Sequence, residues 1–131
     1  MARSSKKARR LVAGDETFLW TVRHEHRVEH GRPEGCRTVL DLRRAGARGR
    51  LLTVFRQGAG RPAPGGWLPS GTVGSAEEGW LNLHEPGTVR ALLDEALRRG
   101  WDPDDPVPLR TDGWRVFGAV AAARGGAERP G

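Results

Sequence analysis

The segment from Trp80 to Trp101 constrains the fold most strongly, because it has the pattern of one amphipathic helix. Pro86 suits a first helical turn, where its missing N–H costs no hydrogen bond, and Gly100 suits the position just past a helix end. The large apolar residues between them recur at helical spacing and form one stripe, made of Val89, Leu92, Leu93, Ala96 and Leu97. Such a stripe has to be buried against another layer, so the sequence predicts a helix at about 86–99 that lies on a sheet.

The rest of the chain has the alternation and composition of strands separated by short, Gly-rich reversals. We expect strands at about 17–28, 36–43 and 51–57, a short strand at 80–83 and a last strand at 114–117. Short reversals between the first three favour an antiparallel meander. The predicted fold class is therefore α+β: a mostly antiparallel, four- or five-stranded sheet with one amphipathic helix packed on one face. The tryptophans that we expect in its core are Trp20, Trp80 and Trp101.

At 131 residues the chain has the length of a single domain. We expect residues 1–14, which are basic and lack periodicity, to form a disordered arm, and residues 15–118 to form one α+β domain. Residues 119–131 are interpreted as a C-terminal tail. Residues 58–76 hold six glycines and three prolines and are interpreted as a long irregular loop, which is either a functional segment or simply a mobile one.

The net charge of +6 is unevenly placed along the chain. The segment 15–118 has as many acidic as basic residues, whereas the first 14 residues carry only basic ones. Within the body, residues 37–61 hold seven arginines against one aspartate, and residues 77–112 hold nine acids against four arginines. Two interpretations remain open: the regions face each other or solvate two surfaces, or the sheet side carries a positive patch for an anionic partner.

Several classes of protein are disfavoured by simple features of the sequence. Cys36 is the single cysteine, so an internal disulfide cannot form, which suits a reducing cytoplasm. No apolar run has membrane-spanning length, and the basic N-terminus is followed by too short an apolar stretch for a signal peptide. We therefore expect a cytoplasmic protein that does not bind membranes. The large excess of arginine over lysine suggests a GC-rich bacterial genome.

The helix segment resembles a module of small uncharacterised bacterial α+β proteins, in which a strand leads into the pattern PGxVRxLLxxALxxGW. The matching residues are Pro86, Gly87, Val89, Arg90, Leu92, Leu93, Ala96, Leu97, Gly100 and Trp101. The resemblance covers about a sixth of the chain and implies the α+β fold. It implies no activity, because none is assigned to such proteins.

A metal site is one functional hypothesis, based on His24, His26 and Cys36. Strand alternation places the two histidines on one face, roughly 7 Å apart along the backbone. A hairpin could bring Cys36 alongside, and imidazole with thiolate would suit zinc. The alternative is an ordinary polar strand end with a small buried cysteine, and we expect no other cofactor.

Catalytic and cofactor motifs are not evident in the sequence. The glycines after Gln57 resemble a dinucleotide-binding loop, but Pro62 and Pro64 prevent the helix that such a loop requires. No nucleophile-elbow or zinc-protease pattern is present. We therefore predict no catalytic residues and favour a protein that is not an enzyme.

The leading functional hypothesis is a non-catalytic binding protein that contacts a protein partner or a second copy of itself through the open sheet face or the 58–76 loop. The alternative is a nucleic-acid-associated protein, whose contacts would come from the basic arm and the Arg-rich hairpin: Arg3, Lys6, Lys7, Arg9, Arg10, Arg48 and Arg50. Arginines at 37, 43 and 56 could extend such a platform, but stacking on bases would need exposed aromatics, and we expect Phe55 in the core.

Overall fold

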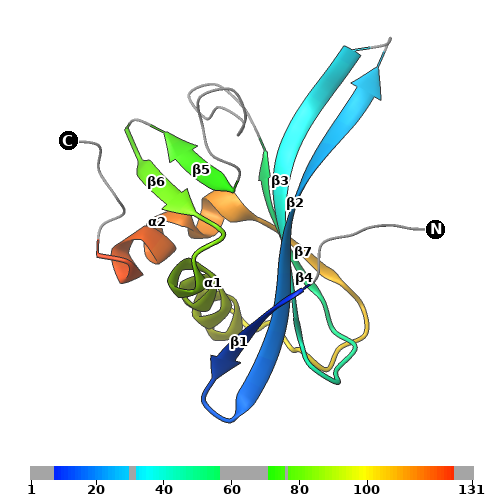
Figure 1. Ribbon diagram of the computed structural model, residues 1–131, viewed down its shortest axis with the longest axis vertical. Helices are drawn as coiled ribbons and strands as arrows, with labels where there is room; N and C mark the ends of the chain where they lie inside the picture. Colours follow the sequence, from blue (N-terminus) through cyan, green and yellow to red (C-terminus); the bar gives the residue numbers. More distant parts are fainter. Residues whose placement is uncertain (1–7, 30–31, 57–70, 76, 126–131) are drawn as a thin grey trace.

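A computed structural model describes residues 8–29, 32–56, 71–75 and 77–125, with residues 26–29 and 32–35 placed by their backbone alone. Two helices and the strands of two sheets follow one another along the chain (Figure 1). Their bounds are β1 (Arg9–Ala13), β2 (Glu16–Glu29), β3 (Arg32–Arg44), β4 (Leu51–Arg56), β5 (Thr72–Ser75), β6 (Gly79–Asn82), α1 (Pro86–Arg98), β7 (Leu109–Asp112) and α2 (Gly113–Ala123).

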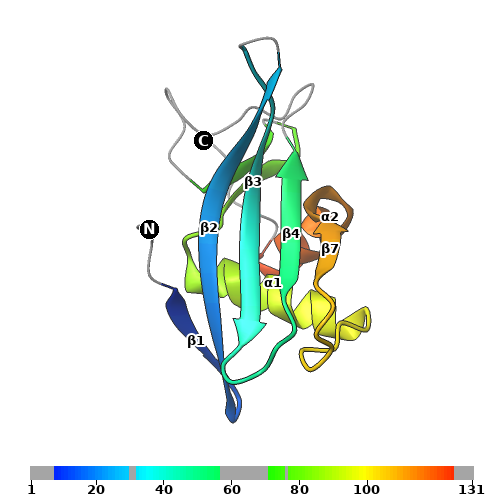
Figure 2. The same cartoon turned by 90° about the vertical axis from the view of Figure 1, so that its right-hand side faces the viewer.

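The main sheet has the order β1-β2-β3-β4-β7. Its first four strands form an antiparallel meander, and β7 adds to β4 in parallel. The strands β2 and β3 are the longest, and their hairpin extends beyond the end of β4 (Figure 2). The expected mostly antiparallel α+β architecture is thus confirmed, with β5 and β6 forming a separate two-stranded sheet.

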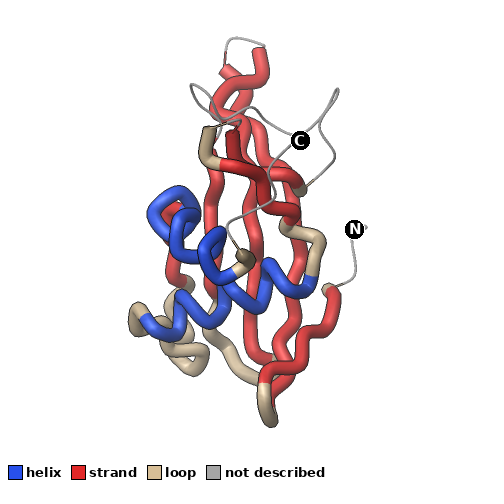
Figure 3. The backbone as a smooth tube through the Cα atoms, turned by 90° about the vertical axis from the view of Figure 1, so that its left-hand side faces the viewer, coloured by secondary structure: helices blue, strands red, loops and turns tan. Residues whose placement is uncertain are grey.

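Both helices and the β5–β6 hairpin lie on the same side of the main sheet (Figures 1 and 3). The stripe of α1 supplies this core, since Val89, Leu92 and Leu93 are buried while Leu97 is 39% exposed at the edge. The helix ends as the sequence predicts, with Gly100 at a φ of +105°. The main core gathers α1, α2 and the alternate residues of β1 to β4, including Trp20 and Trp101; Trp80 is only half-buried.

The expectation of one helix is wrong, because residues 114–117 belong to α2 and not to a strand. Asp112 caps this helix by accepting a hydrogen bond from the backbone N–H of Trp114 at 3.0 Å. Its buried residues recur at helical spacing: Gly113, Val116, Phe117, Val120 and Ala121. The indole of Trp114 donates to the carbonyl of Arg56 at 2.9 Å and so fixes α2 against the end of β4.

Other boundaries also differ from the expectation. The strand β1 occupies part of the segment interpreted as a disordered arm, because Leu11 is buried and the strand pairs with β2. The helix α2 runs to Ala123, past the expected domain end at 118. Part of the expected 58–76 loop forms β5, while residues 57–70 and 76 lie outside the described part. No helix among the described residues is long and apolar enough to span a bilayer.

Candidate functional site

The side of the main sheet opposite the helices is the candidate functional surface, and we call it the helix-free face. No described helix or strand lies over it (Figure 2). Strand alternation directs Phe18, Trp20 and Val22 of β2 to the core, so the residues between them point to the helix-free face. The strand register then places the residues of the other strands on that face row by row.

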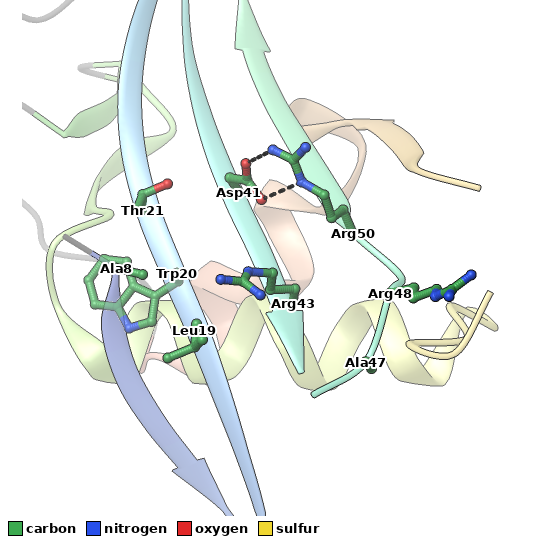
Figure 4. A pocket seen from close by; sticks show the side chains of 9 residues that line it. All are labelled: Ala8, Leu19, Trp20, Thr21, Asp41, Arg43, Ala47, Arg48 and Arg50. Carbon is green, nitrogen blue, oxygen red and sulfur yellow. Dashed lines mark hydrogen bonds and ion pairs between the residues drawn. The ribbon is translucent and has the colours of Figure 1, made fainter. Parts of the chain in front are cut away.

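Nearly every cross-strand row of this face carries an arginine. In order along the strands, the rows are Arg10–Leu19–Arg43, Thr21–Asp41–Leu52–Arg110, Arg23–Val39–Val54–Asp112 and Glu25–Arg37–Arg56. Arg48 and Arg50, in the connection from β3 to β4, add two guanidinium groups beside the first two rows (Figure 4). The face therefore holds eight arginines against three carboxylates, those of Glu25, Asp41 and Asp112.

Two of these carboxylates are held in one chain of ion pairs across the strands. The Asp41 carboxylate accepts from Nη1 of Arg23 at 3.0 Å and from Nε of Arg50 at 3.3 Å, and Arg50 adds a shorter contact through Nη2. Glu25 accepts from Nε of Arg23 at 2.8 Å and from Nε of Arg37 at 2.9 Å. Each carboxylate thus binds two guanidinium groups, so its single negative charge is shared between two arginines.

These ion pairs shift the pKa of two of their members, Arg23 and Glu25. Hydrogen bonding to Glu25, followed by the bond to Asp41, raises the pKa of Arg23 against the opposing effect of burial. The same bond from Arg23, with a smaller contribution from Arg37, lowers the pKa of Glu25, again against burial. Both groups therefore stay charged near neutral pH.

Five arginines of the face make no ion pair with a carboxylate of the described residues: Arg10, Arg43, Arg48, Arg56 and Arg110. The apolar residues of the face are buried and not exposed to solvent: Val39 is 0%, Val54 2% and Leu52 8% exposed. They form a small cluster of their own, separate from the main core. The exposed chemistry of the face is therefore guanidinium.

A hollow of about 520 Å³ lies at the end of this face nearest the β3–β4 connection (Figure 4). Its charged lining comes from Asp41, Arg43, Arg48 and Arg50, and the remaining lining residues are Ala8, Leu19, Trp20, Thr21 and Ala47. The lining thus contains three arginines and one carboxylate, and this excess of guanidinium donors suits oxyanions such as phosphate or carboxylate.

The β3–β4 connection is fixed in place by a contact with the Pro-rich segment after α1. The N–H of Gly49 donates to the carbonyl of Pro103 at 2.9 Å, and Gly49 is buried there. A Cβ at position 49 would collide with the backbone of Pro103 and Asp105. Because Gly49 lies between Arg48 and Arg50, this contact positions both arginines at the hollow.

Two smaller cavities lie on the helix side. One, of about 480 Å³, lies at the start of α1, where Glu85 binds Nη2 of Arg124 at 3.1 Å. The other, of about 290 Å³, lies between α1 and α2 and is lined by both acids and arginines. Their charges already have partners nearby, whereas Arg43 and Arg48 at the hollow pair with no carboxylate of the described residues.

The predicted metal ligands are only partly described. The ring Nδ1 of His24 lies 3.5 Å from Oγ1 of Thr38 on the neighbouring strand, and the His24 side chain is exposed. Cys36 is half-buried and forms no disulfide, and the side chain of His26 lies outside the described residues. Among the described side chains no group of three His, Cys, Asp or Glu could hold a metal ion, so zinc stays a prediction.

The predicted nucleic-acid contacts are distributed over both sides of the sheet. Arg10, Arg48 and Arg50 belong to the helix-free face, as expected of a basic platform. Arg9 does not, because its guanidinium lies 4.7 Å from the ring of Trp20 and donates to the carbonyl of His84 at 2.8 Å. The other predicted basic residues of the arm lie outside the described part: Arg3, Lys6 and Lys7.

Sequence reasoning missed the contributions of Arg23, Arg110 and Asp41 to this face. The alternation of β2 could have revealed Arg23, since it shares a parity with Leu19 and Thr21. Arg110 had no such signal, because the run of prolines before it concealed β7. Phe55 is buried, as predicted.

Comparison with known proteins adds no relative: no family model, curated protein or solved structure matches this chain.

Proposed function

We propose that this protein is a non-catalytic binding module that holds an anionic macromolecule on its helix-free face. The observation that carries the proposal is the set of five arginines without a carboxylate partner among the described residues, on a face that no described helix or strand covers. Guanidinium groups bind carboxylate, sulfate and phosphate oxygens through paired N–H donors. An excess of one sign of charge also speeds the encounter with a partner of opposite sign.

The separation of charge between the two sides of the molecule supports this proposal. Of the described arginines between residues 37 and 61, only Arg44 pairs with an acid from the region 77–112, namely Asp104. The two charged regions therefore do not neutralise each other, and the positive patch considered from the sequence is favoured. The acids of α1 are bound by arginines of α1 or of its C-terminal cap, as in the pair of Asp94 with Nε of Arg90 at 3.1 Å.

A second copy of the chain is disfavoured as the occupant of this face. A two-fold symmetric contact brings the same patch of both copies together, so it would place these arginines against one another. Like charges brought together at an interface cost several kcal/mol. A protein partner would instead have to present an acidic surface.

The experiment that tests the proposal measures binding of two polyanions, heparin and poly-glutamate, by calorimetry at low salt. The double variant Arg43→Gln/Arg48→Gln removes two positive charges from the face that pair with no described carboxylate. The control variant Arg90→Gln/Arg98→Gln removes two positive charges from α1, so both variants have the same net charge. We expect the first variant to bind at least one polyanion about tenfold more weakly than wild type, while the second stays within about twofold.

Two results would contradict the proposal. One is equal weakening by both variants, which would mean that net charge and not the helix-free face controls binding. The other is no detectable binding of any polyanion by the wild-type chain at low salt.

A further inference from the structure

We infer that the anionic partner is a double-stranded nucleic acid, bound through its phosphate backbone without readout of bases. This inference rests on the proposed function and names the partner class of the same face. It is carried by the spread of the five arginines that make no ion pair with a described carboxylate, and by the burial of the apolar and aromatic side chains.

The five arginines that make no ion pair with a described carboxylate are spread over the face and do not converge on one point. They lie on β1, β3, β4 and β7 and in the β3–β4 connection, so they extend across all five strands of the main sheet. Four steps between neighbouring strands cover roughly 19 Å at about 4.8 Å a step. A single small anion would contact one end of such a surface. A duplex carries about one phosphate per 1.7 Å of its axis and can meet several of these arginines at once.

The shielded apolar residues disfavour an acidic protein as the partner. Protein interfaces have an apolar, desolvated centre, and their binding energy concentrates in aromatic and other large anchors. Here the apolar centre of the face is closed, because Val39, Leu52 and Val54 are all buried. Interfaces with nucleic acid are instead polar and strongly positive.

The buried aromatic side chains disfavour a single strand. Proteins that hold single-stranded nucleic acid stack its bases on exposed aromatic rings. The aromatic residues of β2 and β4 all point into the core: Phe18, Trp20 and Phe55. The described part of β2 and β4 therefore offers guanidinium groups to phosphates and no aromatic ring for a base to stack on.

The test uses the full chain and measures its affinity by fluorescence anisotropy for two 20-base-pair DNA duplexes of unrelated sequence. Five phosphate contacts predict that affinity falls about 500-fold between 50 and 200 mM salt, and that the two duplexes bind within about twofold of each other. Arg43→Gln/Arg48→Gln should reduce that fall to about 40-fold, because two contacts are lost. Arg90→Gln/Arg98→Gln should leave the salt dependence unchanged.

Parallel arms with single-stranded DNA of the same length, poly-glutamate and heparin separate the possible failures. Tighter binding of the single strand, or binding of poly-glutamate or heparin without binding of duplex, overturns the nucleic-acid inference and leaves the proposed function standing. Binding of none of these probes overturns both the inference and the proposed function. Equal salt dependence for wild type and Arg43→Gln/Arg48→Gln overturns the assignment of the phosphate contacts to this face.

Discussion

Nη1 of Arg23 on β2 lies 3.0 Å from Oδ2 of Asp41 on β3, on the face of the sheet that no described helix covers. This contact, together with Arg50, occupies the Asp41 carboxylate. Since Glu25 is likewise bound by Arg23 and Arg37, these two acids of the face serve to position arginines. The remaining guanidinium groups keep their charge available to a partner.

The burial of the α1 stripe predicts unequal costs for two leucines of the same helix. Leu93 is 0% exposed and Leu97 is 39% exposed. Leu93→Ala should lower the free energy of unfolding by about 2–5 kcal/mol, and Leu97→Ala by about 1 kcal/mol or less. Leu93→Asp should unfold the domain, because it buries an unpaired charge. Urea denaturation of the variants measures this, and equal costs for the two alanine variants would contradict the placement of α1.

Two glycines of α2 should respond to alanine in opposite directions. A Cβ at Gly113 would collide with the ring of Phe55, whereas a Cβ at Gly118 would meet open space. We expect Gly113→Ala to destabilise by about 1–3 kcal/mol and Gly118→Ala to stabilise by about 0.5–1 kcal/mol. Melting temperatures of both variants test this. Stabilisation by Gly113→Ala would show that α2 does not pack on β4 as described.

The chain of ion pairs predicts a pH dependence of stability. Because the pKa of Glu25 is lowered in the fold, its stabilising contribution is present above the ordinary value of about 4.5 and is lost as pH falls through the lower folded value. An NMR titration of the Glu25 carboxyl should give a midpoint below 4.5 in the wild type. In Arg23→Gln the midpoint should rise, because Arg23 makes the largest contribution. A wild-type midpoint at or above the ordinary value would mean that the chain of ion pairs does not form.

Gly49→Ala should damage binding through geometry alone. The new Cβ would push the β3–β4 connection off Pro103 and displace the two arginines beside it, although their charges remain. We expect weaker polyanion binding and a loss of stability of about 1–3 kcal/mol. Binding is measured at a temperature where circular dichroism shows the variant folded. Unchanged affinity in the folded variant would mean that Arg48 and Arg50 are not positioned by this contact.

The fold was predictable where a single helix or strand carries its own signal. The stripe and ends of α1 are local features, so its bounds followed from Pro86 and Gly100. The helix α2 was missed because residues 114–117, taken alone, have the β-branched and aromatic content of a strand. Its helical spacing becomes visible only when Val120 and Ala121 are included. The strand β1 was missed because charged residues surround Leu11.

The candidate site was less predictable, because it depends on strand register. Arg43 and Arg110 are far apart in the sequence and share a face only through the pairing of β3, β4 and β7. The sequence contains the excess of arginine but does not state which arginines Glu25 and Asp41 bind. Knowing which arginines pair with these two acids requires the positions of side chains on neighbouring strands. The pairing decides which arginines remain available to bind a partner.

The most direct test of the central claim maps the bound surface residue by residue. Backbone amide signals of the isotope-labelled chain are followed by NMR while a 20-base-pair duplex or heparin is added at low salt. We predict shifts in residues 19–23, 39–43 and 48–56 of the helix-free face, with those of α1 at 86–98 unchanged. Shifts concentrated in α1 or the β5–β6 hairpin, with the helix-free face silent, would contradict the account.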